Sequence, residues 1–441
     1  MDYEEVIGTI GGCGLYQKLM LAFLFSSTIM DGLHIGSMVF ITPDLDYRCA
    51  IPGYDNDTYK IQSEIHEELI NEYIPKIEDK GEVVYEKCLI YSNTTENGNG
   101  TTQKCSSWVY DKTNTHTSIT TQLNLVCDKA ILARHTFTFY FMGSILAMVS
   151  CGILSDSFLD ESPRWLLNKK RTKDANIILS NIAKLNEKVL PQTEIVNISS
   201  SNNKRVETWK MFTIPQLRKR TLILTLNWVI VSLVYYGLTL NVGKLYGNFY
   251  VNYFLNSVAE FPGYILCILL LNRVGRKKLQ TSMMVLAGVI CIAGIFPILY
   301  GTKAHRWILT ASSILGRMFI TSNFAIVYIY TLELYPTCIR NGALGALATF
   351  AHVGGSVAPY ILNFSDLVSG KLGRILPMVL MGALAIIAGL LSLLLPETNN
   401  RKMMDNFSDL TKSGELELVT KKDAILKEET HPMKPRQSAR I

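Results

Sequence analysis

Long uncharged apolar runs alternate with polar segments along the whole chain. Thr221–Val242 has 22 residues without a charge and Ile375–Leu395 has 21, and ~20 apolar residues are what a helix needs to cross a bilayer. Because lipid requires each span to satisfy its backbone hydrogen bonds internally, the pattern predicts an all-α, polytopic membrane bundle. The eight predicted spans are Leu19–Ile41, Ile131–Leu154, Thr221–Val242, Asn248–Leu271, Leu279–Gly301, Trp307–Leu332, Gly342–Leu362 and Ile375–Leu395.

Composition supports a membrane protein of 441 residues. Only 18% of residues are charged, against roughly 25% in ordinary globular proteins, and the mean hydropathy is +0.19. The net charge of +6 does not indicate a nucleic-acid partner, because the basic residues gather beside the apolar runs. The first 18 residues are mixed and acidic, so no cleavable signal peptide is predicted.

The segment Asp44–Lys129 has the features of an extracellular loop. It carries 8 basic and 15 acidic residues, a local net charge of −7. Paired cysteines and N-x-S/T sequons are typical of extracellular segments, although four cysteines allow three pairings that sequence cannot distinguish. The disulfide candidates are Cys49, Cys88, Cys105 and Cys127, and the glycosylation candidates are Asn56, Asn93 and Asn99.

Basic residues concentrate on the opposite side of the predicted membrane. Ser155–Arg220 has 13 basic and 7 acidic residues, the turn Leu271–Leu279 has four basic residues, and the tail from Glu397 has nine. The positive-inside rule therefore places both termini in the cytoplasm of a multi-pass protein, which we expect in the plasma membrane. Within the basic linker, 174–187 predicts an amphipathic helix whose apolar face includes Ile177, Ile178, Ile182 and Leu185, either resting on the bundle or acting as a gate.

Two pairs of motifs recur in the chain. Gly152–Asp156 and Leu271–Lys277 each close a span, while Glu161–Arg164 and Pro396–Thr398 form a second pair. These motifs resemble the duplicated turns of the major facilitator superfamily. Further strings resemble its organic cation and anion transporter (solute carrier 22) family over nearly the whole chain. They are Met1–Ile7, Arg48–Pro52, Asn124–Asp128, Glu161–Leu167, Tyr236–Asn241, Glu260–Pro262 and Glu333–Asn341.

The repeat indicates that part of the first half is missing. Asn272 and Glu397 are 125 residues apart, enough for four helices, whereas Asp156 and Glu161 are separated by 5. The resemblance therefore implies that the third to sixth family helices are absent. The expected domains are a cytoplasmic N-terminus (1–18), a two-helix remnant (19–154) with its extracellular loop (44–129), a cytoplasmic linker (155–220), a six-helix bundle (221–396) and a disordered tail (397–441).

Ionisable groups within spans are candidates for substrate binding, because they are costly in lipid. The resemblance implies that Glu260 is a cation-binding carboxylate, although it could instead pair with a polar group of a neighbouring helix. His352 replaces the charged residue common at its family position, and a packed neutral histidine is the alternative. Tyr235, Tyr236 and Asn241 would complete the site, unless the tyrosines are core residues. Asp31, His34 and Arg317 also lie within spans; Arg317 matches a family basic position, and Asp31 and His34 have no assigned role.

The resemblance also implies a conformational lock on the cytoplasmic side. Its candidate residues are Asp156, Arg273, Arg276, Glu333 and Arg340, although the two arginines of the turn could simply anchor the chain at the membrane. Asn272 replaces the usual aspartate, which should weaken this lock.

No motif for ATP binding, zinc proteolysis or nucleophilic catalysis is present in the sequence. We therefore expect no enzyme, cofactor or metal. The predicted function is alternating-access transport of small organic ions, most of all cations, by a chain that as it stands could be transport-incompetent. The alternative is a membrane protein that regulates or assembles with a full-length relative.

Overall fold

The computed structural model describes most of the chain apart from the C-terminal tail. The described residues are 3–43, 45–79, 82–92, 101–113, 117–158, 163–168, 171–189, 210–300, 305–336, 339–367 and 371–400. The predicted tail therefore lies outside the described residues, except for its first four positions. Seven helical segments in the described part are long and apolar enough to cross a membrane, and they coincide with seven of the eight predicted spans.

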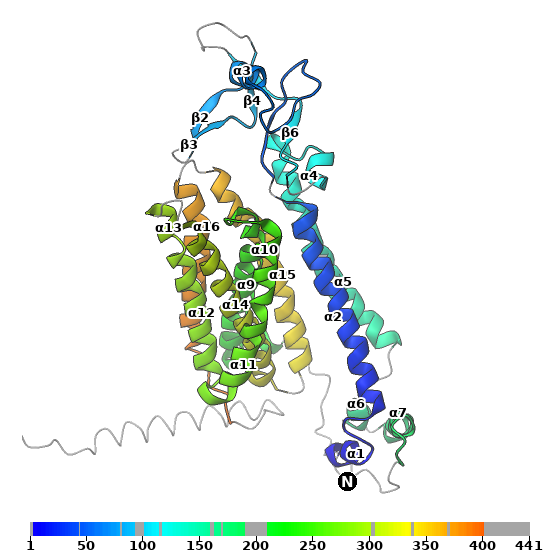
Figure 1. Cartoon of the computed structure of the whole chain (residues 1–441). Coiled ribbons are helices and arrows are strands. Elements are labelled where there is room, and N and C mark those ends of the chain that lie inside the picture. Colours follow the sequence, from blue (N-terminus) through cyan, green and yellow to red (C-terminus); the bar gives the residue numbers. More distant parts are fainter. Residues whose placement is uncertain are drawn as a thin grey trace, which may run out of the picture.

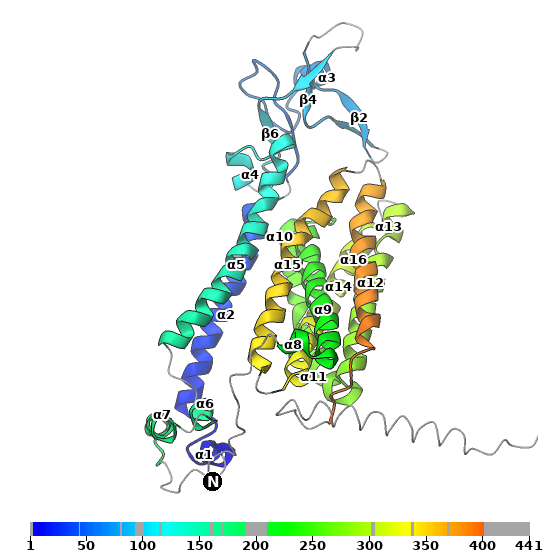
Figure 2. The ribbon, with the colours of Figure 1, turned by 180° about the vertical axis from the view of Figure 1, so that it is seen from behind.

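The C-terminal half forms a bundle of six membrane-spanning segments (Figures 1 and 2). Two of the predicted spans are interrupted: one breaks at Ala259 and another between Ala293 and Phe296. The helices are α9 (Pro215–Leu240), α10 (Phe249–Val258), α11 (Glu260–Val274), α12 (Arg276–Ala293), α13 (Phe296–Leu299), α14 (Arg306–Leu334), α15 (Arg340–Leu367) and α16 (Lys371–Ser392), with a 3₁₀ turn, η2, at Asn241–Lys244.

Helix α9 lies at the centre of this bundle and packs on α14, α15 and α16. Trp228 is fully buried, and its indole N–H donates a hydrogen bond to the Thr331 hydroxyl at 3.1 Å. Gly354 of α15 faces the α9 backbone so closely that a Cβ there would lie 2.1 Å from the Val229 carbonyl oxygen. Small residues of this kind allow close backbone approach, which drives helix association in lipid.

The N-terminal half contributes two long helices, α2 (Leu15–Ile41) and α5 (Ala130–Phe158). They run side by side along one flank of the bundle (Figures 1 and 2), and α5 packs against α15. Helix α5 contains the eighth predicted span. The most apolar stretch of α2 has none of its residues buried, whereas 61% of the corresponding stretch of α9 is buried.

Short helices lie at the end where the chain begins (Figure 1), namely α1 (Tyr3–Thr9), α6 (Pro163–Asn168) and α7 (Thr172–Leu185). Asn186 joins the end of α7 to the segment between α1 and α2, because its amide donates to the Ile10 carbonyl at 3.0 Å and its oxygen accepts from the Tyr16 amide at 2.9 Å. The predicted amphipathic helix forms, but its buried face is wrong in part, since Ile177 and Leu185 are exposed and Leu179 packs inward instead. A further short helix, α8 (Lys210–Thr213), packs on α9 (Figure 2).

The described residues between 45 and 129 form a separate unit above the helices, here called the cap (Figure 1). Its six short strands pair antiparallel as β1–β6, β2–β3 and β4–β5, which the all-α prediction did not anticipate. Disulfides join Cys49 to Cys105 and Cys88 to Cys127. The elements are β1 (Tyr47–Cys49), α3 (Glu64–Tyr73), β2 (Lys76–Asp79), β3 (Glu82–Tyr85), β4 (Leu89–Tyr91), β5 (Thr102–Lys104), β6 (Trp108–Tyr110), α4 (Ile119–Gln122) and η1 (Cys127–Lys129).

Candidate functional site

Glu260 lies at the break between α10 and α11, where the sequence predicted a cation-binding carboxylate. Its Oε1 atom is 2.5 Å from the Nη2 atom and 3.1 Å from the Nε atom of Arg317 on α14. The Tyr235 hydroxyl donates to the same oxygen at 3.0 Å. The carboxylate is thus paired with a cation, which corresponds to the structural alternative considered for this residue.

Arg317 is held on several sides. Its guanidinium carbon lies 3.5 Å from the centre of the Tyr235 ring, and its Nη1 donates to the Tyr235 carbonyl at 2.8 Å and to the Thr239 hydroxyl. Its side chain is only 7% exposed, against 23% for Glu260. Removing one member of such a buried pair costs about 3–5 kcal/mol, because the remaining charge is left without compensation. The pair therefore fastens α9, α11 and α14 together.

A second group lies where α5 meets the bundle. The Phe141 ring centre is 4.7 Å from that of Tyr236 and 5.9 Å from that of His352. Phe141 fits against Gly355, where a Cβ would approach within 2.6 Å of the ring. Tyr236 and His352 are thus brought together, and Tyr236 also lies edge-on to Tyr235 at 5.1 Å.

Hydrogen bonds extend this α5–α15 contact toward the cap. The Tyr360 hydroxyl lies 2.7 Å from Nδ1 of His135 and 3.0 Å from the hydroxyl of Thr138. Asn241, by contrast, ends α9 and begins η2, and no contact among the described residues joins its side chain to the Glu260 pair. The structure therefore brings together four of the five predicted binding residues.

Asp31 and His34, which have no role assigned from the sequence, lie in the middle of α2. Both side chains are exposed, and the His34 ring centre is 5.9 Å from that of Tyr140 on α5. Asp31 lies within electrostatic range of Tyr236 and of His352 in the bundle. The helix therefore directs a carboxylate toward the aromatic groups between the two halves.

Two of the five predicted lock residues, Arg276 and Glu333, meet at the end of the bundle opposite the cap. Arg276 lies 3.0 Å from Glu333, and its Nη1 donates to Asn399 at 2.5 Å. Glu397 accepts from the backbone N–H of Arg276 at 2.9 Å, and the Thr398 hydroxyl donates to Glu333 at 2.5 Å. The Pro396–Thr398 motif and the basic turn are therefore physically joined.

The remaining lock candidates do not share these contacts. Arg273 is exposed, and Arg340 donates to the Tyr335 carbonyl at 3.3 Å. The side chain of Asp156, on α5, lies outside the described residues. The carbonyl of Asn272 accepts a 3.3 Å hydrogen bond from Asn399, so the backbone rather than the substituted side chain makes this contact.

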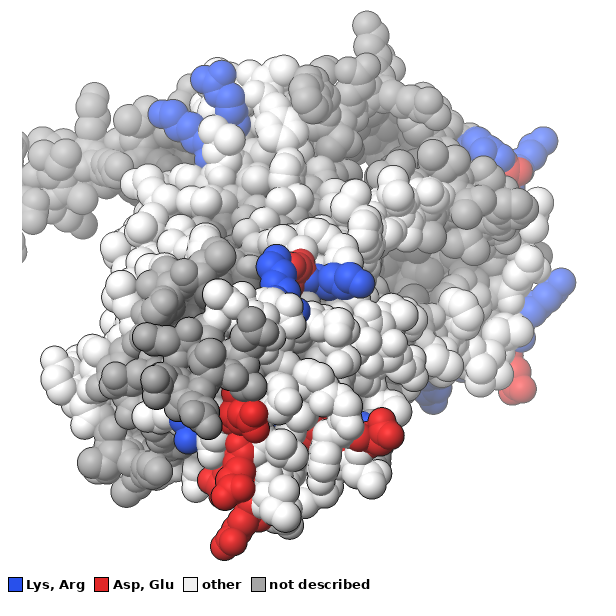
Figure 3. Space-filling view, turned by 90° about the horizontal axis from the view of Figure 1, so that it is seen from above, with Lys and Arg blue, Asp and Glu red and all other residues white. Residues whose placement is uncertain are grey.

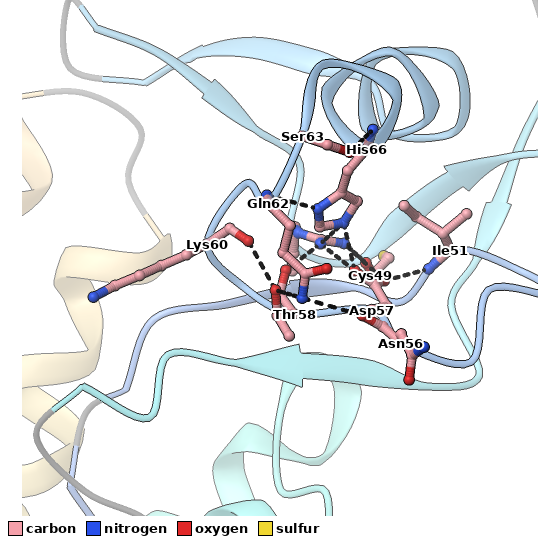
Figure 4. Close-up of polar contacts among 10 residues, drawn as sticks. Cys49, Ile51, Asn56, Asp57, Thr58, Lys60, Gln62, Ser63 and His66 are labelled. Carbon is pink, nitrogen blue, oxygen red and sulfur yellow. Dashed lines mark hydrogen bonds and ion pairs between the residues drawn. The ribbon is translucent and has the colours of Figure 1, made fainter.

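The cap contains a buried polar cluster that the sequence did not reveal (Figure 4). Arg48 donates to Asp57 at 3.0 Å from Nη1 and again from Nη2, and Nε2 of His66 is 3.0 Å from Asp57. Nδ1 of His66 accepts from the Gln62 amide, which leaves the ring proton on Nε2 for donation to Asp57. Burial raises the pKa of Asp57, but hydrogen bonds from Arg48, the Ile51 amide and His66 outweigh it and hold this pKa below its usual value.

The surface of the molecule carries one predicted glycosylation site and several small groups of charged side chains. Asn56 is exposed beside the buried cluster, and Asn93 and Asn99 lie outside the described residues. Seen from above, the described Lys and Arg side chains and the Asp and Glu side chains form small separate groups (Figure 3). No group of three His, Cys, Asp or Glu residues in the described part of the chain could hold a metal ion.

The spanning helices, the paired charges and the joined motifs define an all-α, polytopic membrane bundle of the kind predicted from the sequence. The profile of the "Sugar (and other) transporter" family matches residues 123–259. The chain is 27% identical to an organic cation transporter protein of Drosophila melanogaster, over 93% of this chain and 94% of the relative. It is 25% identical to solute carrier family 22 member 21 of Mus musculus, over 94% of each.

A third relative, solute carrier family 22 member 15-like of Xenopus tropicalis, is 35% identical over 61% of this chain and 54% of its own length. These matches confirm the predicted resemblance: the chain is similar to members of the organic cation transporter (solute carrier 22) family. It is a multi-pass membrane protein that is similar to transporters rather than to enzymes.

Proposed function

We propose that this protein acts on small organic cations at the plasma membrane, through the alternating-access architecture of its family. The observation that carries the proposal is the group of aromatic and ionisable side chains between the two halves of the molecule. Phe141 and Tyr140 come from α5, Tyr236 from α9 and His352 from α15. Aromatic faces attract cations by about 0.5–2 kcal/mol each, and the first similar relative is named an organic cation transporter protein.

The chain by itself is proposed not to transport. The alignment with the Drosophila melanogaster relative has 538 positions, about 128 more than the roughly 410 residues (93% of 441) that it covers in this chain. This excess supports the absence of four helices between Asp156 and Glu161. Two helices cannot surround a polar cavity, and polar groups left facing lipid are costly.

Restoring the missing helices tests the substrate class. The third to sixth helices of the Drosophila melanogaster relative would be inserted after Phe158, and cells expressing the chimera would be given a fluorescent organic cation. We expect saturable uptake that unlabelled tetraethylammonium inhibits and p-aminohippurate, an organic anion, does not. Stronger inhibition by the anion would contradict the cation assignment.

The second candidate function is assembly with a full-length relative. The exposed apolar surface of α2 favours it, since Leu21, Phe23, Phe25 and Met30 are each more than 60% exposed. Co-expression of the tagged chain with a full-length carrier of the same family should then give co-purification in mild detergent. Replacing the four α2 residues by alanine should weaken co-purification, and an unchanged yield would exclude α2 as the contact.

A further inference from the structure

The charges inside the membrane-spanning region are unequally compensated. Glu260 is neutralised by Arg317, which also binds the ring and carbonyl of Tyr235. No hydrogen bond or ion pair to Asp31 is found among the described residues, although Asp31 lies in the middle of the apolar helix α2. An ionised group in a span is tolerated where it faces a water-filled cavity or a partner. Asp31 can therefore bind a cation, whereas the Glu260 carboxylate is already neutralised by Arg317.

The face of α2 that carries Asp31 meets α5. Ser27, Asp31 and His34 follow the i, i+4, i+7 spacing of a single helix face. The His34 ring centre lies 5.9 Å from that of Tyr140 on α5. Phe40, nine residues beyond Asp31 and therefore on the opposite face, packs against Tyr253 of α10 with ring centres 4.7 Å apart. Helix α2 thus turns its polar face toward the aromatic side chains of α5.

Four groups interact electrostatically with Asp31. They lie on four different helices: Tyr140 on α5, Tyr236 on α9, Tyr328 on α14 and His352 on α15. Three of them are tyrosines, whose rings attract a cation through their faces. An anionic centre flanked by aromatic rings is the chemistry that recognises an ammonium or pyridinium group.

We propose that Asp31 is the carboxylate that recognises the organic cation, with Tyr140, Tyr236 and Tyr328 as its aromatic partners, and that Glu260 is the structural counter-ion of Arg317. The assignment rests on the proposed function and deepens it. It moves the charge that selects a cation from the complete half of the molecule to the two-helix half. His352 then lies near the same centre.

The test measures binding to the full chain, which does not depend on transport. The purified protein in lipid nanodiscs would be titrated with a fluorescent methylpyridinium dye, with tetraethylammonium as competitor. Asp31→Asn should weaken dye binding by at least roughly tenfold, since a unit charge acts strongly at low dielectric. Asp31→Glu should restore most of the affinity, and Ser26→Ala, on a neighbouring face of α2, should leave it unchanged.

The competing assignment is tested by the double variant Glu260→Gln with Arg317→Met, which removes both members of the pair. We expect its dye affinity to stay within a few fold of wild type. If it loses binding while Asp31→Asn keeps it, Glu260 is the recognition carboxylate and the inference is wrong, although the cation function stands. If the wild-type chain shows no saturable dye binding and prefers an anionic dye, the proposed function fails together with the inference.

Discussion

Helices α9 and α2 have similar apolar sequences and opposite environments. The most apolar stretches have mean hydropathies of 1.7 and 1.4, yet 61% of the α9 stretch is buried and none of the α2 stretch. Helix α9 packs on α14, α15 and α16, whereas α2 contacts α7, a single ring of α5 and, at one end, α10. Hydropathy therefore identifies a span without indicating how many helices pack against it.

The largest difference in the free energy of unfolding is expected between substitutions of charged residues in the bundle and in α2. Arg317→Met leaves the Glu260 carboxylate buried without its cation, and we expect a loss of about 3–5 kcal/mol in the free energy of unfolding. Adding Glu260→Gln should recover most of that loss. Asp31→Asn on the exposed helix α2 should change stability by less than about 0.5 kcal/mol. Thermal unfolding in detergent measures all three, and equal losses for Arg317→Met and Asp31→Asn would contradict the contrast.

A leucine pair tests packing in the same way. Leu224 of α9 is fully buried in the cluster around Trp228, whereas Leu21 of α2 is 68% exposed. Leu224→Ala should cost about 2–5 kcal/mol, because it opens a cavity. Leu21→Ala removes the same atoms from an exposed position on α2 and should leave the unfolding midpoint nearly unchanged. A comparable loss for Leu21→Ala would mean that α2 is covered in the membrane.

Several features of the molecule could be predicted from local sequence. Spans follow from hydropathy, and Glu260 stands out because a carboxylate in a span is unusual. A polar partner on a neighbouring helix is one of its two interpretations, but Arg317 could not be identified as that partner, because the two residues are 57 positions apart and only the crossing of α11 and α14 joins them. For the same reason the helical pattern of α7 identified the helix but not its buried face, which is set by Ile10 of a distant segment.

The contacts among polar residues of the cap could not be predicted from local sequence either. Arg48 and His66 are 18 residues apart, and their contact through Asp57 depends on how the loop folds. The cap strands escaped prediction because strands of three or four residues are too short to establish a periodic pattern.

The cap should be resistant to mild acid. Because the folded-state pKa of Asp57 is lowered, its stabilising contribution is present above the unfolded value of 3.8 and is lost as pH falls below it. We therefore expect the cap to keep its structure at pH 5 and to lose stability below about pH 3.8. Asp57→Asn should cost about 1–3 kcal/mol through weakened bonds to Arg48 and His66. Protease resistance of the cap measures both, and acid sensitivity at pH 5 would contradict the assigned role.

The smallest expected change is in glycosylation, which reports the side of the membrane that each segment faces. We expect glycans on Asn56, Asn93 or Asn99, because the cap is proposed to face the exterior, and none on Asn197 or Asn406. Asn→Gln variants at single sites, compared before and after enzymatic deglycosylation, should shift only for the cap positions. A glycan on Asn197 would reverse the proposed orientation of the chain.

The most direct test of the account is cation uptake by the chain alone, beside the same chain with four helices restored. Both would be expressed in cells, with surface exposure confirmed by antibody to a tag in the cap. The account predicts that uptake of the fluorescent cation by the unmodified chain equals that of empty-vector cells, while the restored chain shows saturable uptake. Saturable uptake by the unmodified chain, well above the vector control, would contradict it.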